Sequence, residues 1–333
     1  MGPSCGTLLA MTCRVIRLTG LLAAGLAASA GALALANRAL LLDDLPPTLQ
    51  GAMHDWLWRG WRVRYTTLGD GPPLVLVHSV HAAASSFEWR DIFEPLSRHH
   101  TIYALDLLGF GKSERPAAQF SGPFYADLLS AFLGEVVPGP AVVMASSLSS
   151  AYAVAAARAR PERIERLVLI SPTGTTTTGL PGKVAGWLLA QPLVGSAGFN
   201  ALVSEASIRR YLGKVYADPE QIDDSMVGQE WATSHQPNAR LAPAAFIAGR
   251  LDLPLAADTA PIQSPIQSPI LVVFGSVPGL GTLATRDKLL SLGPRVALRT
   301  IDGVGPLPHN EAPDEVVGLV EGWLAGPPAS ETR

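Results

Sequence analysis

A serine within a run of small residues has the clearest potential for chemistry in this chain. Ser147 lies in the segment 142–151, VVMASSLSSA, where an apolar run passes through small residues directly into an Ala-rich stretch. Its neighbours two positions away, Ala145 and Ser149, are both small. A tight strand-to-helix turn strains the backbone and leaves no room for larger side chains at those two places. The spacing therefore predicts a nucleophilic serine on such a turn, with a helix N-cap serine as the alternative.

A serine hydroxyl becomes a good nucleophile only beside a base, usually a histidine that a carboxylate orients. Two histidines lie in loops that could supply this base: His309, in the segment GVGPLPHNEAP over 303–313, and His81, shortly after an early apolar run. For each of them, a structural or solvated role remains the alternative, because a lone histidine is more often structural or solvated than catalytic. A carboxylate to orient the histidine is harder to place. No Asp or Glu occurs over 167–204 or over 259–286, the stretches that contain the apolar runs 167–171 and 270–275 and the residues after them.

The elements that must position these residues alternate between two kinds. Short apolar runs, typical of strands buried on both faces, occur at 74–78, 101–107, 141–145, 167–171, 270–275 and 296–301. Amphipathic stretches occur at 125–137, 148–160, 286–292 and 313–324. This alternation predicts a mostly parallel sheet with helices on both faces. Nearly a hundred residues separate the fourth run from the fifth, with helix-like pieces at 183–190, 207–216 and 218–234, and we expect a helical insertion there.

Several separate segments resemble one known family, in the right order. They are LVLVHSVHAAASSFEWR (74–90), ALDLLGFGKSERP (104–116), PERIERLVLI (161–170) and the loop over 303–313. Together with the turn at Ser147, which resembles a nucleophile elbow, they are similar to the α/β-hydrolase family over residues 62–326. The resemblance implies an α/β-hydrolase fold, a mostly parallel sheet flanked by helices, with a helical cap inserted between strands 6 and 7.

The resemblance also implies roles for individual residues. Ser147 is the expected nucleophile, and the backbone N–H groups of Val80 and Leu148 are the expected oxyanion hole. Further pocket candidates are His78, Ser79, His81 and Ser146, although Ser79 stands where the family usually has glycine.

The base and acid positions depart from the family pattern. Pro306 occupies the usual histidine position, and Pro278 lies near the usual position of the carboxylate. His309 follows three residues after Pro306, so it is proposed as a displaced base. The triad implied by the resemblance is therefore degraded.

Two functional hypotheses follow. The first is a serine hydrolase, esterase-like, acting on an ester or other acyl small molecule with Ser147 and an atypical base. The second is a catalytically inactive relative that binds an apolar small molecule or a protein partner. No metal cluster, phosphate-binding glycine loop or dinucleotide fingerprint occurs in the sequence, so we expect no metal and no cofactor.

The composition of the chain excludes further classes of protein and partner. The 333 residues carry a formal net charge of −3 and are 48% hydrophobic, which suits a folded domain and offers no basic field for nucleic acid. The two cysteines, Cys5 and Cys13, exclude a disulfide scaffold or a cysteine-based metal site. The sequence leaves the oligomeric state open.

The N-terminal segment is distinct from the rest. Leu18–Asn37 is an uncharged Ala/Leu/Gly-rich run, preceded by Arg14 and Arg17, and long enough for a membrane-spanning helix. We expect a membrane anchor with the body extracytoplasmic; secretion after signal cleavage near Ala36 and a buried helix are the alternatives. The expected divisions are an anchor or signal (1–37), a linker (38–60), a first core part (61–171), the cap (172–268), a second core part (269–326) and a tail (327–333).

Overall fold

The computed structural model describes residues 28–42, 45, 48–174, 179–255, 266–278 and 286–326. Within them, eight strands form one sheet in the order β1-β2-β4-β3-β5-β6-β7-β8. Their bounds are β1 Ala52–Trp58, β2 Trp61–Leu68, β3 Pro73–Val77, β4 Thr101–Leu105, β5 Ala141–Ser146, β6 Ile164–Ile170, β7 Ile270–Gly275 and β8 Val296–Ile301. The pairings β1–β2 and β2–β4 are antiparallel, and every other pairing is parallel. This confirms the mostly parallel sheet that the sequence predicts.

Alternate residues of the central strands supply two hydrophobic cores, one on each face of the sheet. Val75 and Val77 of β3 belong to the core under α3 (Gly122–Glu135), α4 (Ser149–Ala159) and α10 (Arg286–Leu290). Leu74 and Leu76 belong to the core under α2 (Arg90–Ser97) and α12 (Pro313–Ala325). Since side chains alternate along a strand, this two-sided burial explains why the runs are apolar throughout.

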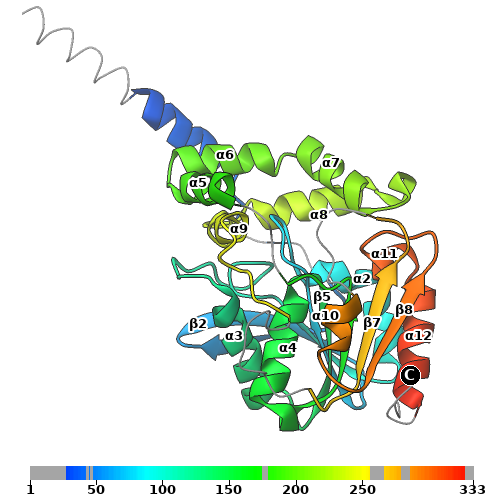
Figure 1. Ribbon diagram of the computed structural model, residues 1–333. Helices are drawn as coiled ribbons and strands as arrows, with labels where there is room; N and C mark the ends of the chain where they lie inside the picture. The colour runs from blue at the N-terminus through cyan, green and yellow to red at the C-terminus, as the bar shows by residue number, and fades with distance from the viewer. Residues whose placement is uncertain are drawn as a thin grey trace, which may run out of the picture.

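A helical cap lies between β6 and β7, at the end of the sheet where the parallel strands finish (Figure 1). Its helices are α5 Gly179–Ala190, α6 Val194–Leu202, α7 Glu205–Val215, α8 Asp224–Ser234 and α9 Leu241–Ile247. The expected insertion is therefore confirmed as a set of helices between the sixth and seventh strands. The carboxyl ends of parallel strands are where α/β folds build ligand sites, so the cap covers the expected site.

Part of the segment 38–60, expected to be a linker, has regular secondary structure. Residues 52–58 form β1, which pairs along its length with β2. Before it, residues 28–39 are helical.

No helix among the described residues is long and apolar enough to span a membrane. Part of the run 18–37 lies outside the described residues.

Candidate active site

Ser147 lies at a sharp turn between β5 and α4. Its φ is 51°, in the left-handed region that non-glycine residues rarely adopt. The strain is held by backbone hydrogen bonds, because Ser147 N–H donates to Ile170 O (2.9 Å) and Thr173 N–H donates to Ser147 O (3.2 Å). Leu148, and not Ser147, is the N-cap residue of α4, so the helix-capping alternative does not describe this serine. The geometry is the strained strand–turn–helix arrangement that the sequence predicts.

Two backbone N–H groups near this turn have no hydrogen-bond partner in the part of the chain that the structure describes. Neither Val80 N–H nor Leu148 N–H forms a hydrogen bond with another described residue. Ser79, before Val80, instead directs its N–H (2.7 Å) and its Oγ–H (2.6 Å) to Oε2 of Glu88. A serine is therefore accommodated at the usual glycine position by a hydrogen bond from its own hydroxyl.

His78 is wholly buried and engaged with the backbone. Leu107 N–H donates to its Nε2 (3.1 Å), so Nδ1 carries the proton and donates to Ser79 O (2.6 Å). The Ser149 hydroxyl donates to His78 O (2.6 Å), which ties the elbow to the end of β3. His78 therefore holds the loop in place and has no nitrogen left for substrate.

A buried carboxylate–histidine pair lies beside the elbow. His309 is fully buried in α11 (Pro308–Glu311), with its ring 4.7 Å from that of Trp89. Its Nε2 lies 3.2 Å from Oε1 of Glu88, within ion-pair distance, and neither of its ring nitrogens forms a hydrogen bond with a described residue. Asn310 fixes the same loop by donating to the backbone oxygen of Glu88 (2.7 Å).

Glu88 is an ionised carboxylate in this setting. Burial alone would raise its pKa, but the nearby His309 ring and the neighbouring hydroxyls of Ser146 and Ser79 outweigh burial and lower the pKa to about 2. Ser146 ends β5 and directly precedes Ser147, so the carboxylate lies near the elbow. Sequence reasoning missed Glu88, because a single acidic residue between Phe87 and Trp89 carries no sign of its burial.

The structure brings no histidine into hydrogen-bond contact with the Ser147 hydroxyl. All seven histidines are among the described residues, and the Ser147 Oγ contact is with Thr173 Oγ1, at 3.4 Å. Pro306 lies in the loop before α11, and Pro278 is exposed beyond β7. Within the described residues, no group of three or more His, Cys, Asp or Glu side chains is placed to hold a metal ion.

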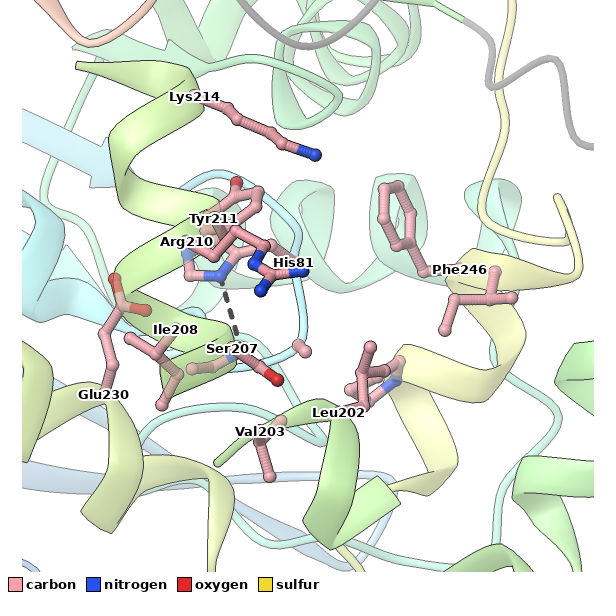
Figure 2. Close-up of a pocket in the computed structure, with 14 residues that line it drawn as sticks. His81, Leu202, Val203, Ser207, Ile208, Arg210, Tyr211, Lys214, Glu230 and Phe246 are labelled. Atoms are coloured by element: carbon pink, nitrogen blue, oxygen red, sulfur yellow. Dashed lines mark hydrogen bonds between the residues drawn. The ribbon is translucent and has the colours of Figure 1, made fainter. Parts of the chain in front are cut away.

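A cavity of about 360 Å³ lies between the cap and the loop that follows Val80. Its floor is formed by residues 81–83, and its apolar walls include Val203, Ile208 and Phe246. Figure 2 shows Arg210 and Lys214 reaching from α7 toward the open space, opposite Phe246. The cavity therefore combines an apolar interior with two cationic side chains.

A smaller chamber of about 30 Å³ adjoins this cavity and connects it to Glu88, because His81, Tyr211 and Glu230 line both spaces. Burial lowers the pKa of His81 to about 4, against the opposing effect of Glu88, so its ring is neutral at pH 7. Burial, with a further contribution from Glu88, raises the pKa of Glu230 to about 8, although Arg90 opposes it. Glu230 is therefore mostly protonated at pH 7 and presents a hydrogen-bond donor to the chamber.

Solved structures share this fold. An epoxide hydrolase, CorEH, aligns with a TM-score of 0.68 at 21% identity, covering 82% of this chain and 98% of that one. A bacterial membrane phospholipase A aligns with a TM-score of 0.66 at 19% identity, covering 96% and 97%. At these identities, the likeness concerns the fold.

Sequence relatives point the same way. A 2-hydroxymuconate semialdehyde hydrolase of Pseudomonas sp. (strain CF600) is 29% identical over 180 residues, or 54% of this chain and 59% of that protein. An uncharacterized Mycobacterium tuberculosis protein is 32% identical over 162 residues, or 46% of each chain. The chain thus spans about half the length of the curated relatives it matches. The model of the alpha/beta hydrolase family matches residues 74–319, and the chain therefore belongs to this family.

Proposed function

We propose that the protein is a serine hydrolase in which Ser147 is the nucleophile, His309 the base and Glu88 the carboxylate that orients the base. The observation that carries the proposal is the buried contact between His309 and Glu88 beside the elbow. It supplies an acid in place of the one missing near Pro278, because Glu88 comes from the segment after β3. A carboxylate in this role fixes the ring and stabilises the imidazolium that forms during reaction.

The proposed reaction divides the chemistry among Ser147, His309 and two backbone N–H groups. His309 takes the Ser147 proton at Nδ1, the nitrogen that faces away from Glu88, while Oγ attacks the carbonyl carbon of the substrate. The N–H groups of Val80 and Leu148 hold the resulting oxyanion. The tetrahedral species then expels its alcohol, which takes the proton from His309, and water hydrolyses the acyl-enzyme by the same route in reverse. Hydrogen bonds of this kind often form fully only with substrate bound, so the loop 306–309 must close on Ser147 in that state.

The cavity supports a class of substrate. Its apolar walls suit the body of a small ester or other acyl compound, and Arg210 and Lys214 suit an anionic group on that compound. The name of the Pseudomonas relative describes hydrolysis of a small carbonyl compound, 2-hydroxymuconate semialdehyde. We therefore propose a small acyl substrate with an apolar body and a carboxylate.

Labelling with a fluorophosphonate probe tests the proposal. We expect labelling of the wild-type chain, none of Ser147→Ala, and strongly slowed labelling of Glu88→Gln and His309→Gln. The matched control is Ser207→Ala, which removes a serine that lines the cavity and leaves labelling unchanged. Labelling that survives in His309→Gln at the wild-type rate would refute the assignment of the base.

A second function is favoured by the missing contact between Ser147 and any histidine. In this case the protein binds the same class of molecule without hydrolysing it. The folded wild-type chain would then resist the probe, while titration calorimetry would still detect binding of a carboxylate-bearing apolar ligand that Lys214→Met weakens.

A further inference from the structure

One side of α5 is apolar and uncovered. Leu180, Val184, Trp187 and Leu188 are 74%, 50%, 63% and 45% exposed. Their spacing of three and four residues places them on a single helix face. The opposite face of α5 packs on α9, because a Cβ at Gly186 would lie 2.4 Å from the Ala244 oxygen. The exposed residues therefore point away from the hydrolase core.

The apolar surface continues on two neighbouring helices. Val194 of α6 is 64% exposed, and Leu35 of the helix 28–39 is 71% exposed. That helix is fixed to α6 through Asn37, which donates to Leu193 O (3.2 Å) and accepts from the amide of Asn200 (3.1 Å). Figure 1 shows it, in dark blue, beside α5 and α6 and running away from the sheet. We call the residues Leu35, Leu180, Val184, Trp187, Leu188 and Val194 the cap face.

The described segments that carry the cap face contain basic residues and no acidic ones. No Asp or Glu occurs in the described residues 28–42 and 179–204, whereas Arg38 and Lys183 are both exposed there. Apolar side chains flanked by cations are the composition of surfaces that lie on anionic bilayers. Large apolar side chains gathered on one exposed helix face, as on α5, also mark an interaction site more often than a bare surface.

We propose that the cap face rests on an anionic lipid bilayer, which Trp187 and Leu180 enter. In the sequence, residues 28–37 of the helix that carries Leu35 belong to the uncharged run 18–37, which has the length and composition of a segment suited to lipid. This proposal is independent of the chemistry of Ser147.

Quenching of tryptophan fluorescence by brominated lipid tests the proposal. The full chain is incorporated into vesicles of phosphatidylcholine and phosphatidylglycerol, with or without bromine on the acyl chains. We expect bromine to quench the wild-type chain and the Trp187→Phe variant to lose most of that quenching. The matched control is Trp323→Phe, in which the removed ring packs on Arg166 of the core and the quenching persists.

Two results would overturn the proposal. Equal quenching of wild type and Trp187→Phe would place the lipid contact at other tryptophans. No quenching, combined with a dimer in detergent that Leu180→Ser converts to monomers, would show that a second copy of the chain covers the cap face. Circular dichroism confirms the fold of each variant, which we expect to be unchanged because these side chains are exposed.

Discussion

Replacing Glu88 with glutamine should cost the protein stability in a manner that depends on pH. The pKa of Glu88 falls from its ordinary value of 4.5 to about 2 on folding. Each pKa unit corresponds to about 1.4 kcal/mol, so the ionised carboxylate contributes about 3 kcal/mol. Because the folded pKa is the lower one, this contribution is complete above about pH 4.5 and is lost as the pH falls toward 2.

Urea unfolding at a series of pH values measures this effect. At pH 7 we expect Glu88→Gln to be about 3 kcal/mol less stable than wild type, with the difference shrinking steadily below pH 4.5. Glu94→Gln is the matched control, since Glu94 is 62% exposed in its ion pair with Arg98 and should change stability by less than about 0.5 kcal/mol. A Glu88→Gln difference that is absent, or that stays constant from pH 7 to pH 3, would refute the electrostatic account of the pair.

Three further predictions concern other residues. Gly111→Ala should lower the free energy of unfolding by at least about 2 kcal/mol, because the added Cβ would lie 2.1 Å from the Asp106 carboxyl. Gly139→Ala is the control: Gly139 also has a positive φ but faces open space, so thermal or urea unfolding should show a loss of about 1 kcal/mol. Glu230→Gln should stabilise the protein increasingly as the pH rises from 5 to 8, reaching on the order of 3 kcal/mol, since wild type must ionise a buried carboxyl whose pKa is about 8; a flat pH profile would contradict this. Lys214→Met should raise KM about tenfold for a carboxylate-bearing ester and leave kcat and the KM of the uncharged methyl ester nearly unchanged; equal effects on both esters would exclude the anionic subsite.

The alternation of strands and helices along the chain and the place of the cap could be predicted because both depend on local patterns. Runs such as Leu74–Val77 are apolar on both faces, and only a strand between two helical layers buries both. The long interval from Ser171 to Ile270 contains no apolar strand pattern and therefore predicts the position of the cap. The surroundings of the helix 28–39 were harder to predict from the sequence, because an Ala/Leu-rich segment is compatible with a membrane anchor, a signal peptide and a buried helix alike.

The site was predictable only in part. The small residues on both sides of Ser147 predict a tight turn, and the structure has this turn. The partner of His309 could not be foreseen, because Glu88 is more than two hundred positions away in the chain and reaches the histidine only through the packing of the loop after β3 against α11. The pKa values of Glu88 and Glu230 likewise follow from burial and neighbours, which one-dimensional spacing does not contain.

The cap also bears on how the chain folds. β6 and β7 are hydrogen-bonded neighbours, with Leu167 opposite Ile270, yet the whole cap separates them in sequence. Joining them closes a loop of about a hundred residues, and non-local pairings of this kind form slowly because the entropy of closure is lost before any contact is gained. Doubling such a loop costs only about 0.6 kcal/mol more. The cap is therefore free to change in length during evolution at little thermodynamic cost, while the joining of β7 to β6 sets a slow step in folding.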